Sequence, residues 1–276
     1  MLDFLNAIKV LILGIIEGIT EWLPVSSTGH MLLLNGLWPL KNVSDGFWDT
    51  FQYMIQLGAI LAVVILFWKR MWPFRKPQEG KSAVKMPVIR TWLKVVVACI
   101  PGAIAEFLIG DKIPETMPVI AAMLILYGVV FIVLEIWNAK RAPTMQRMGE
   151  IDYKTALIIG LFQVLAVVPG TSRSGMTIIA ALLMGVSRIA AVEFSFFIAV
   201  PVMLGMSAIK LIKGGFAFSG AEIVYLLLGM IVAFAVSLIV IRPILNYIKK
   251  HDFKVFGYYR IGLGILIILL LVFKAL

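Results

Sequence analysis

Ten runs of apolar residues, separated by charged residues or by prolines and glycines, make up most of the chain. A membrane-spanning helix takes roughly 20 residues, and six of the runs are long enough to cross a bilayer. These six runs cover residues 51–68, 92–110, 118–137, 193–213, 222–245 and 258–275. The other four form two adjacent short pairs, 4–23 with 28–40 and 155–168 with 174–186. The pattern predicts an all-α polytopic membrane protein with one integral membrane domain over residues 1–276.

Each short pair is interrupted by a polar turn that contains proline. The first turn reads Pro-Val-Ser-Ser-Thr-Gly-His over residues 24–30, and the second reads Pro-Gly-Thr-Ser-Arg-Ser-Gly over residues 169–175. Proline cannot continue a helix, whereas the serines and threonines that follow it suit the start of a new one. We therefore expect each pair to be two helices joined by a turn.

The two halves of the chain also resemble each other. A constant offset of 146 residues places Gly14 on Gly160, Glu17 on Gln163, Ser26 on Ser172, Thr28 on Ser174 and Gly29 on Gly175. The prolines fall one position out of step, and each short pair is followed by three full spans. This arrangement predicts a five-segment unit used twice, over about residues 1–137 and about residues 150–276.

Two topologies are compatible with this repeat. If the short pairs cross the membrane fully, their turns lie on opposite faces of the bilayer. If the pairs are re-entrant, both turns reach the middle of the bilayer and can meet there. We favour an inverted-topology repeat with six full transmembrane helices and two re-entrant helical hairpins, over about residues 4–40 and 155–186, because such repeats build sites near the midplane.

Composition excludes a soluble fold and charge indicates an orientation. Hydrophobic residues make up 61% of the chain and charged residues only 14%, against about a quarter charged in ordinary soluble domains. The formal net charge is +10, which in a membrane protein indicates topology rather than a nucleic-acid partner. Eighteen of the 25 Lys and Arg residues, Arg260 among them, are assigned to loops on one side and six to the other. The first side is therefore expected to be cytoplasmic and the N-terminus external.

Two acidic residues lie within the first apolar run. Glu17 and Glu21 are four residues apart and so share one helical face, where buried like charges are costly. Two carboxylates can bind Mg²⁺ or Ca²⁺ when a phosphate completes the coordination. The alternative interpretation is that one carboxylate is protonated, or that both lie near the lipid headgroups.

A basic residue occupies the second turn. Arg173 lies between Ser172 and Ser174, with Thr177 one helical turn further on. A guanidinium beside several hydroxyls, at the start of a helix with free backbone N–H groups, is suited to a phosphate. Alternatively, Arg173 neutralises one of the glutamates, which would also bring the two turns together.

The first turn offers a candidate nucleophile and a candidate base. His30 follows Ser27 by three residues and could act there as base, acid or nucleophile. A lone histidine is more often structural, and the hydroxyls of the turn could serve only as helix caps. The only other histidine, His251, lies in an expected loop, which argues against a phosphatase that needs two histidines.

Together these motifs resemble the undecaprenyl-diphosphate phosphatases linked to bacitracin resistance. The Glu/Gln-x-x-x-Glu motif of that family is matched by residues 17–21, its Pro-Val-Ser-Ser-Thr-Gly-His stretch by residues 24–30, and its Pro-Gly-x-Ser-Arg-Ser-x-x-Thr motif by residues 169–177. The resemblance extends over the whole chain. It implies a phosphoric anhydride hydrolase that converts undecaprenyl diphosphate to undecaprenyl phosphate and inorganic phosphate. Such an enzyme recycles the lipid carrier of cell-wall glycan synthesis and contributes to bacitracin resistance.

The resemblance also implies roles for individual residues. Glu17 and Glu21 would bind a divalent cation, Mg²⁺ or Ca²⁺, and Ser27, His30, Glu21 and Arg173 would be catalytic. Ser27 is the preferred nucleophile, although His30 or a metal-bound water stays an alternative. The residues expected to bind the substrate phosphates are Ser26, Thr28, Ser172, Arg173, Ser174 and Thr177.

The same resemblance predicts the environment of the protein. It would be a multi-pass protein of the bacterial cell membrane, in contact with the bilayer and with a polyprenyl diphosphate lipid, and its site would open toward the external face. A homodimer is compatible with this prediction. The alternative function is a polyprenyl-phosphate flippase or an anion transporter that uses the same midplane site, because secondary transporters also build sites from broken helices.

Overall fold

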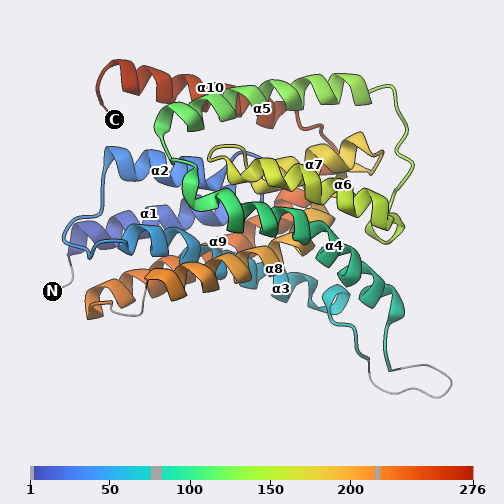
Figure 1. Ribbon diagram of the computed structural model, residues 1–276, viewed down its shortest axis with the longest axis horizontal. Helices are drawn as coiled ribbons and strands as arrows, with labels where there is room; N and C mark the ends of the chain where they lie inside the picture. The colour runs from blue at the N-terminus through green and yellow to red at the C-terminus, as the bar shows by residue number, and fades with distance from the viewer. Residues whose placement is uncertain (1–2, 76–82, 215–217, 276) are drawn as a thin grey trace.

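The described residues of the computed structural model, 3–75, 83–214 and 218–275, form ten α-helices and no β-strand (Figure 1). The helices are α1 (Phe4–Thr20), α2 (Ser27–Leu37), α3 (Phe47–Met71), α4 (Met86–Ile109), α5 (Met117–Asn138), α6 (Tyr153–Gln163), α7 (Arg173–Leu183), α8 (Arg188–Gly214), α9 (Gly220–Ile248) and α10 (Lys254–Val272). Six of them, α3, α4, α5, α8, α9 and α10, are long and apolar enough to cross a membrane. The predicted all-α class and its six spanning helices are confirmed.

The short pairs form as two helices each, with polar caps at their outer ends. Asp3 caps α1 by accepting a hydrogen bond from the Leu5 amide, and Asp152 caps α6 by accepting one from the Thr155 amide. The hydrogen bonds from Thr155 lower the pKa of the Asp152 carboxyl. A short 3₁₀ turn, Val164–Val167, follows α6 and leads into the second polar turn.

Helices from the two halves of the chain pack against each other. α1 packs on α9 and α6 packs on α4, while α3 packs on α8 and α5 packs on α10, as Figure 1 shows for α5 and α10. Glycines allow the close approaches: a Cβ on Gly14 would lie 2.9 Å from the carbonyl oxygen of Gly229, and a Cβ on Gly160 would collide with the carbonyl of Ala98. Small residues permit such contacts between membrane helices, and Gly14 and Gly160 are related by the sequence offset.

The core of the bundle lies around α8. Of its most apolar stretch, 61% is buried, against 11% for α4. Large apolar side chains remain exposed on the outer helices, including Phe107 at 88% and Ile239 at 71% exposure. An apolar surface of this kind is suited to contact with lipid.

One predicted charge position is wrong. Arg260 was expected among the cytoplasmic loop charges, but it lies in the second turn of α10 and is fully buried. Its guanidinium binds backbone carbonyls of the two polar turns. The sequence does not indicate this burial, because the hydropathy pattern and the loop charges depend on residue type and not on how the helices pack around Arg260. Two other residues counted in that loop set, Lys76 and Lys81, lie outside the described residues.

Candidate active site

The two polar turns have the same local geometry. Ser26 and Ser172 are the N-caps of α2 and α7, and both have positive φ angles, 69° and 77°. The amide of Gly29 donates to Ser26 Oγ at 3.3 Å, and the amide of Gly175 donates to Ser172 Oγ at 3.1 Å. Strained backbone of this kind clusters at functional sites. Each cap oxygen accepts a backbone hydrogen bond, and each hydroxyl proton can still be donated.

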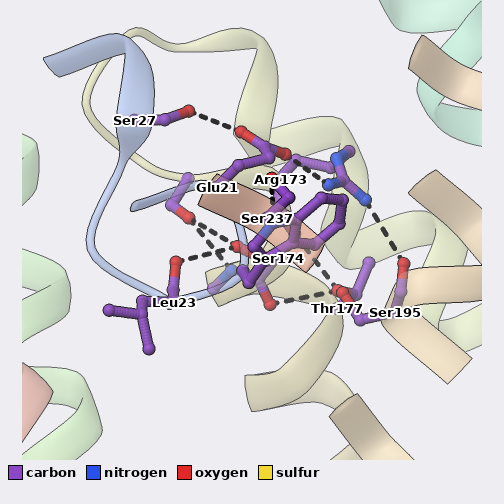
Figure 2. Close-up of polar contacts among 11 residues, drawn as sticks. Glu21, Leu23, Ser27, Arg173, Ser174, Thr177, Ser195 and Ser237 are labelled. Carbon is purple, nitrogen blue, oxygen red and sulfur yellow. Dashed lines mark hydrogen bonds and ion pairs between the residues drawn. The ribbon is translucent and has the colours of Figure 1, made fainter. Parts of the chain in front are cut away.

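A chain of polar contacts joins the two turns (Figure 2). Ser27 Oγ donates to Glu21 Oε2 at 2.5 Å, and Arg173 Nη2 donates to Glu21 Oε1 at 2.6 Å. Ser174 Oγ donates to the carbonyl of Leu23 at 3.3 Å. Glu21 and Ser27 are buried, and 15% of the Arg173 side chain is exposed. The structure therefore brings together three predicted catalytic residues from opposite halves of the chain.

Glu17 lies one helical turn before Glu21 and is fully buried, and among the described residues neither of its carboxylate oxygens has a hydrogen-bond partner. Buried polar groups are almost always satisfied, so these two oxygens are free to act as ligands. The carboxylate oxygens of Glu17 and Glu21 fit a divalent cation such as Mg²⁺ or Ca²⁺, which prefers oxygen ligands. Among the described residues no group of three or more His, Cys, Asp or Glu side chains could complete such a site. Phosphate oxygens and water would have to supply the remaining ligands.

Thr177 faces the interior of the protein. Its Oγ1 lies 2.9 Å from Ser195 Oγ and within 3.2 Å of the carbonyl oxygens of Arg173 and Ser174. Arg173 Nη1 donates to the carbonyl of Ser195 at 3.3 Å. Ser195, on α8, therefore supports both residues. The sequence by itself assigns Ser195 no role, because a serine within an apolar helix carries no sign of what its side chain contacts.

His30 contacts partners other than Ser27. Its Nδ1 lies 2.7 Å from the carbonyl of Ser26, and its Nε2 lies 2.7 Å from the hydroxyl of Tyr259. A carbonyl only accepts hydrogen bonds, so Nδ1 carries a proton, and in the neutral ring Nε2 accepts from Tyr259. The two rings stack with their centroids 5.6 Å apart. The hydroxyl of Ser27 is thus bound to Glu21 rather than to His30.

The other predicted phosphate ligands line the same two turns. Ser172 and Ser174 have their hydroxyl oxygens 3.2 Å apart at the start of α7. Thr28 is half-buried in the first turn of α2, next to Ser27. The first turns of two helices therefore converge on one polar region, where free backbone N–H groups favour an anion.

Comparison with known proteins agrees with this arrangement. The family described as Bacitracin resistance protein BacA matches residues 10–266. An undecaprenyl-diphosphatase of Enterococcus faecalis is 58% identical over 272 residues, covering 98% of each chain. One of Lachnoclostridium phytofermentans is 52% identical, covering 96% of this chain and 97% of the relative, and undecaprenyl-diphosphatase 1 of Clostridioides difficile is 51% identical, covering 96% of each chain. These relatives are named as phosphatases, not as transporters. This chain belongs to the bacitracin resistance protein BacA family.

Proposed function

We propose that this protein hydrolyses undecaprenyl diphosphate to undecaprenyl phosphate and inorganic phosphate, and so recycles the lipid carrier and contributes to bacitracin resistance. The observation that carries the proposal is the contact chain from Ser27 through Glu21 to Arg173. A hydroxyl, a carboxylate that could accept its proton and a guanidinium suited to phosphate lie side by side in this chain, which supports these roles. The names of the relatives supply the substrate.

The first chemical step uses Ser27 and Glu21. Ser27 Oγ attacks the terminal phosphorus, its proton passes to Glu21 Oε2, and the bond from that phosphorus to the bridging oxygen breaks. Undecaprenyl phosphate leaves, and Ser27 carries the phosphoryl group until water hydrolyses it. General-base assistance of this kind contributes about 10²–10⁴-fold to a rate.

Arg173 links substrate binding to this step. Without substrate it neutralises Glu21. A diphosphate is a stronger partner for a guanidinium, so substrate would draw Arg173 away and leave Glu21 free to take the proton. The caps Ser26 and Ser172, together with Thr28 and Ser174, would orient the phosphate oxygens.

The divalent cation is proposed at the same place. Glu17, whose carboxylate oxygens have no hydrogen-bond partner among the described residues, would bind it together with Glu21. When bound, such a cation neutralises phosphate charge as the bridging bond breaks. Mg²⁺ and Ca²⁺ both match the carboxylate oxygens.

An inverted repeat with two re-entrant hairpins, α1–α2 and α6–α7, accounts for the reciprocal packing of the halves. α1 packs on α9 of the second half, and α6 packs on the corresponding helix of the first half, α4. The shared strained caps support the same relation. The loop charges favour an external opening of the site, while a homodimer stays a prediction.

Phosphate release by the purified protein in detergent tests the function. We expect release from undecaprenyl diphosphate that is abolished by a chelator and restored by Mg²⁺ or Ca²⁺. Glu21→Gln should lower the rate by at least about a hundredfold. The matched control is Glu150→Gln, a change at an exposed glutamate that ends the 3₁₀ turn Met148–Glu150 and accepts hydrogen bonds from the Gln146 and Arg147 amides. Movement of the lipid across vesicle membranes without phosphate release would overturn the proposal in favour of a transporter.

A further inference from the structure

Arg260 is a buried cation whose hydrogen bonds go to backbone carbonyls. Its Nη1 donates to the carbonyl of Pro24 at 3.0 Å, and its Nη2 donates to those of Gly170 at 2.9 Å and Thr171 at 3.0 Å, with Met123 at 3.3 Å. Its side chain is fully buried, and Arg260 forms no ion pair with any residue in the described part of the chain. Burying an unpaired charge is costly, so this position calls for an explanation beyond stability.

The carbonyls that Arg260 binds belong to both polar turns. Pro24 lies in the turn between α1 and α2, three residues before Ser27. Gly170 and Thr171 lie in the turn between α6 and α7, and Arg173 follows two residues later. Carbonyls of broken helices lack helical partners, and the bilayer interior has no water to satisfy them. A single side chain from α10 therefore satisfies both turns and links them to each other.

The shape of the guanidinium suits this position. Its donors point outward in a plane and can reach several carbonyls in different directions. A lysine at the same position presents its donors from one nitrogen atom and cannot span the same set. Gly170 has a positive φ of 87°, and a Cβ on it would lie 2.8 Å from the backbone of Ile120. The second turn is therefore also packed tightly against α5, the helix that supplies the Met123 carbonyl.

We propose that Arg260 is a positioning residue for the active site: it sets the separation and orientation of the two turns, and thereby of Ser27 relative to Arg173. This inference rests on the proposed phosphatase function. The ion pair of Arg173 with Glu21 also joins the turns, but in the proposed mechanism that pair opens when Arg173 binds phosphate. Arg260, which does not take part in phosphate binding, continues to link the two turns while the substrate is bound, together with the hydrogen bond from Ser174 to the Leu23 carbonyl.

Two substitutions of Arg260 test the proposal, measured by steady-state kinetics and by hydrogen–deuterium exchange. Arg260→Met keeps the bulk of the side chain and removes every donor, and Arg260→Lys keeps the charge and some donors. The matched control is Arg188→Met, because Arg188 also joins separate helices, through Glu135. Glu135, the carboxylate partner of Arg188, is not part of the candidate active site.

We expect Arg260→Met to lower kcat by about 10²-fold, the usual cost of a displacement of about 1 Å between reacting groups. KM should change by less than about threefold, because each turn can still bind phosphate and only the transition state requires both. Hydrogen exchange should rise together in residues 21–29 and 168–175 while α8 keeps its protection. Arg260→Lys should fall between the wild type and Arg260→Met, and Arg188→Met should retain the wild-type kcat.

Three results would overturn the inference. One is a kcat for Arg260→Met equal to that of Arg188→Met. Another is increased exchange in only one of the two turns. The third is increased exchange along the whole chain in both Arg260 variants, which would make Arg260 a residue of general stability. If the wild type releases no phosphate, the proposed function fails, while the exchange measurement still reports whether Arg260 couples the turns.

Discussion

Ser27 donates a 2.5 Å hydrogen bond to Glu21 Oε2, so the hydroxyl proton of the proposed nucleophile is bound to a carboxylate. His30, three residues further along the same helix, bonds instead to the Ser26 carbonyl and to Tyr259. Glu21, the proposed base, and His30 therefore lie at separate positions around the turn. Substitutions of Glu21 and of His30 should have different consequences.

Ser27→Ala should lower phosphate release by at least about a thousandfold, because it removes the nucleophile. The matched control is Ser187→Ala, which removes a hydroxyl outside the two turns that donates to the Gln146 carbonyl and accepts from the Ala190 amide at the start of α8. Rapid quenching with substrate labelled in its terminal phosphate should trap a phosphorylated enzyme, and mass spectrometry should map the label to Ser27. A label on His30, or near-normal turnover of Ser27→Ala, would exclude the serine route.

Tyr259→Phe should lower kcat about threefold to tenfold, since one hydrogen bond contributes roughly 0.5–1.5 kcal/mol and this one orients the ring of His30. Tyr258→Phe is the control, because Tyr258 is the preceding residue and its side chain is 62% exposed. Equal rates for the two variants would show that the contact of Tyr259 with His30 has no role in turnover.

Glu17→Gln should raise the Mg²⁺ concentration needed for half-maximal activity by about tenfold or more, the range seen when a residue that supports a metal site is lost. Binding of Mn²⁺ to the purified protein, followed by electron paramagnetic resonance, gives a readout that does not depend on turnover. Glu150→Gln again serves as the control. An unchanged cation requirement in Glu17→Gln would mean that the orphaned carboxylate of Glu17 binds no cation.

Glu135→Gln should destabilise the protein without changing the chemistry. Glu135 is 1% exposed, pairs with Arg188 and accepts a hydrogen bond from the Phe253 amide at 3.0 Å, so it ties α5 to the starts of α8 and α10. Breaking a buried pair costs about 3–5 kcal/mol; because 38% of the Arg188 side chain is exposed, we expect roughly 2 kcal/mol. Thermal unfolding in detergent measures this loss, and kcat of the folded variant should match the wild type.

Local patterns in the sequence were sufficient for the secondary structure. Apolar runs long enough to span a bilayer predicted the six long helices, and the prolines and serines of the two turns predicted the broken pairs. Hydropathy and capping depend on neighbouring residues, so they can be read without the fold. For the same reason, charges within an apolar run identified Glu17 and Glu21 as candidates, and a charge within a polar turn between two such runs identified Arg173.

Only the tertiary structure decided which of these groups meet. Arg173 and Glu21 are 152 positions apart, and no local pattern specifies their contact; it follows from the packing of α1 and α6 against helices of the opposite half. The same packing turns Arg260 from an expected loop charge into the buried link between the turns, and assigns Ser27 to Glu21 instead of the nearby His30. Sequence spacing gives the distance along the chain, whereas helix packing determines where each side chain points.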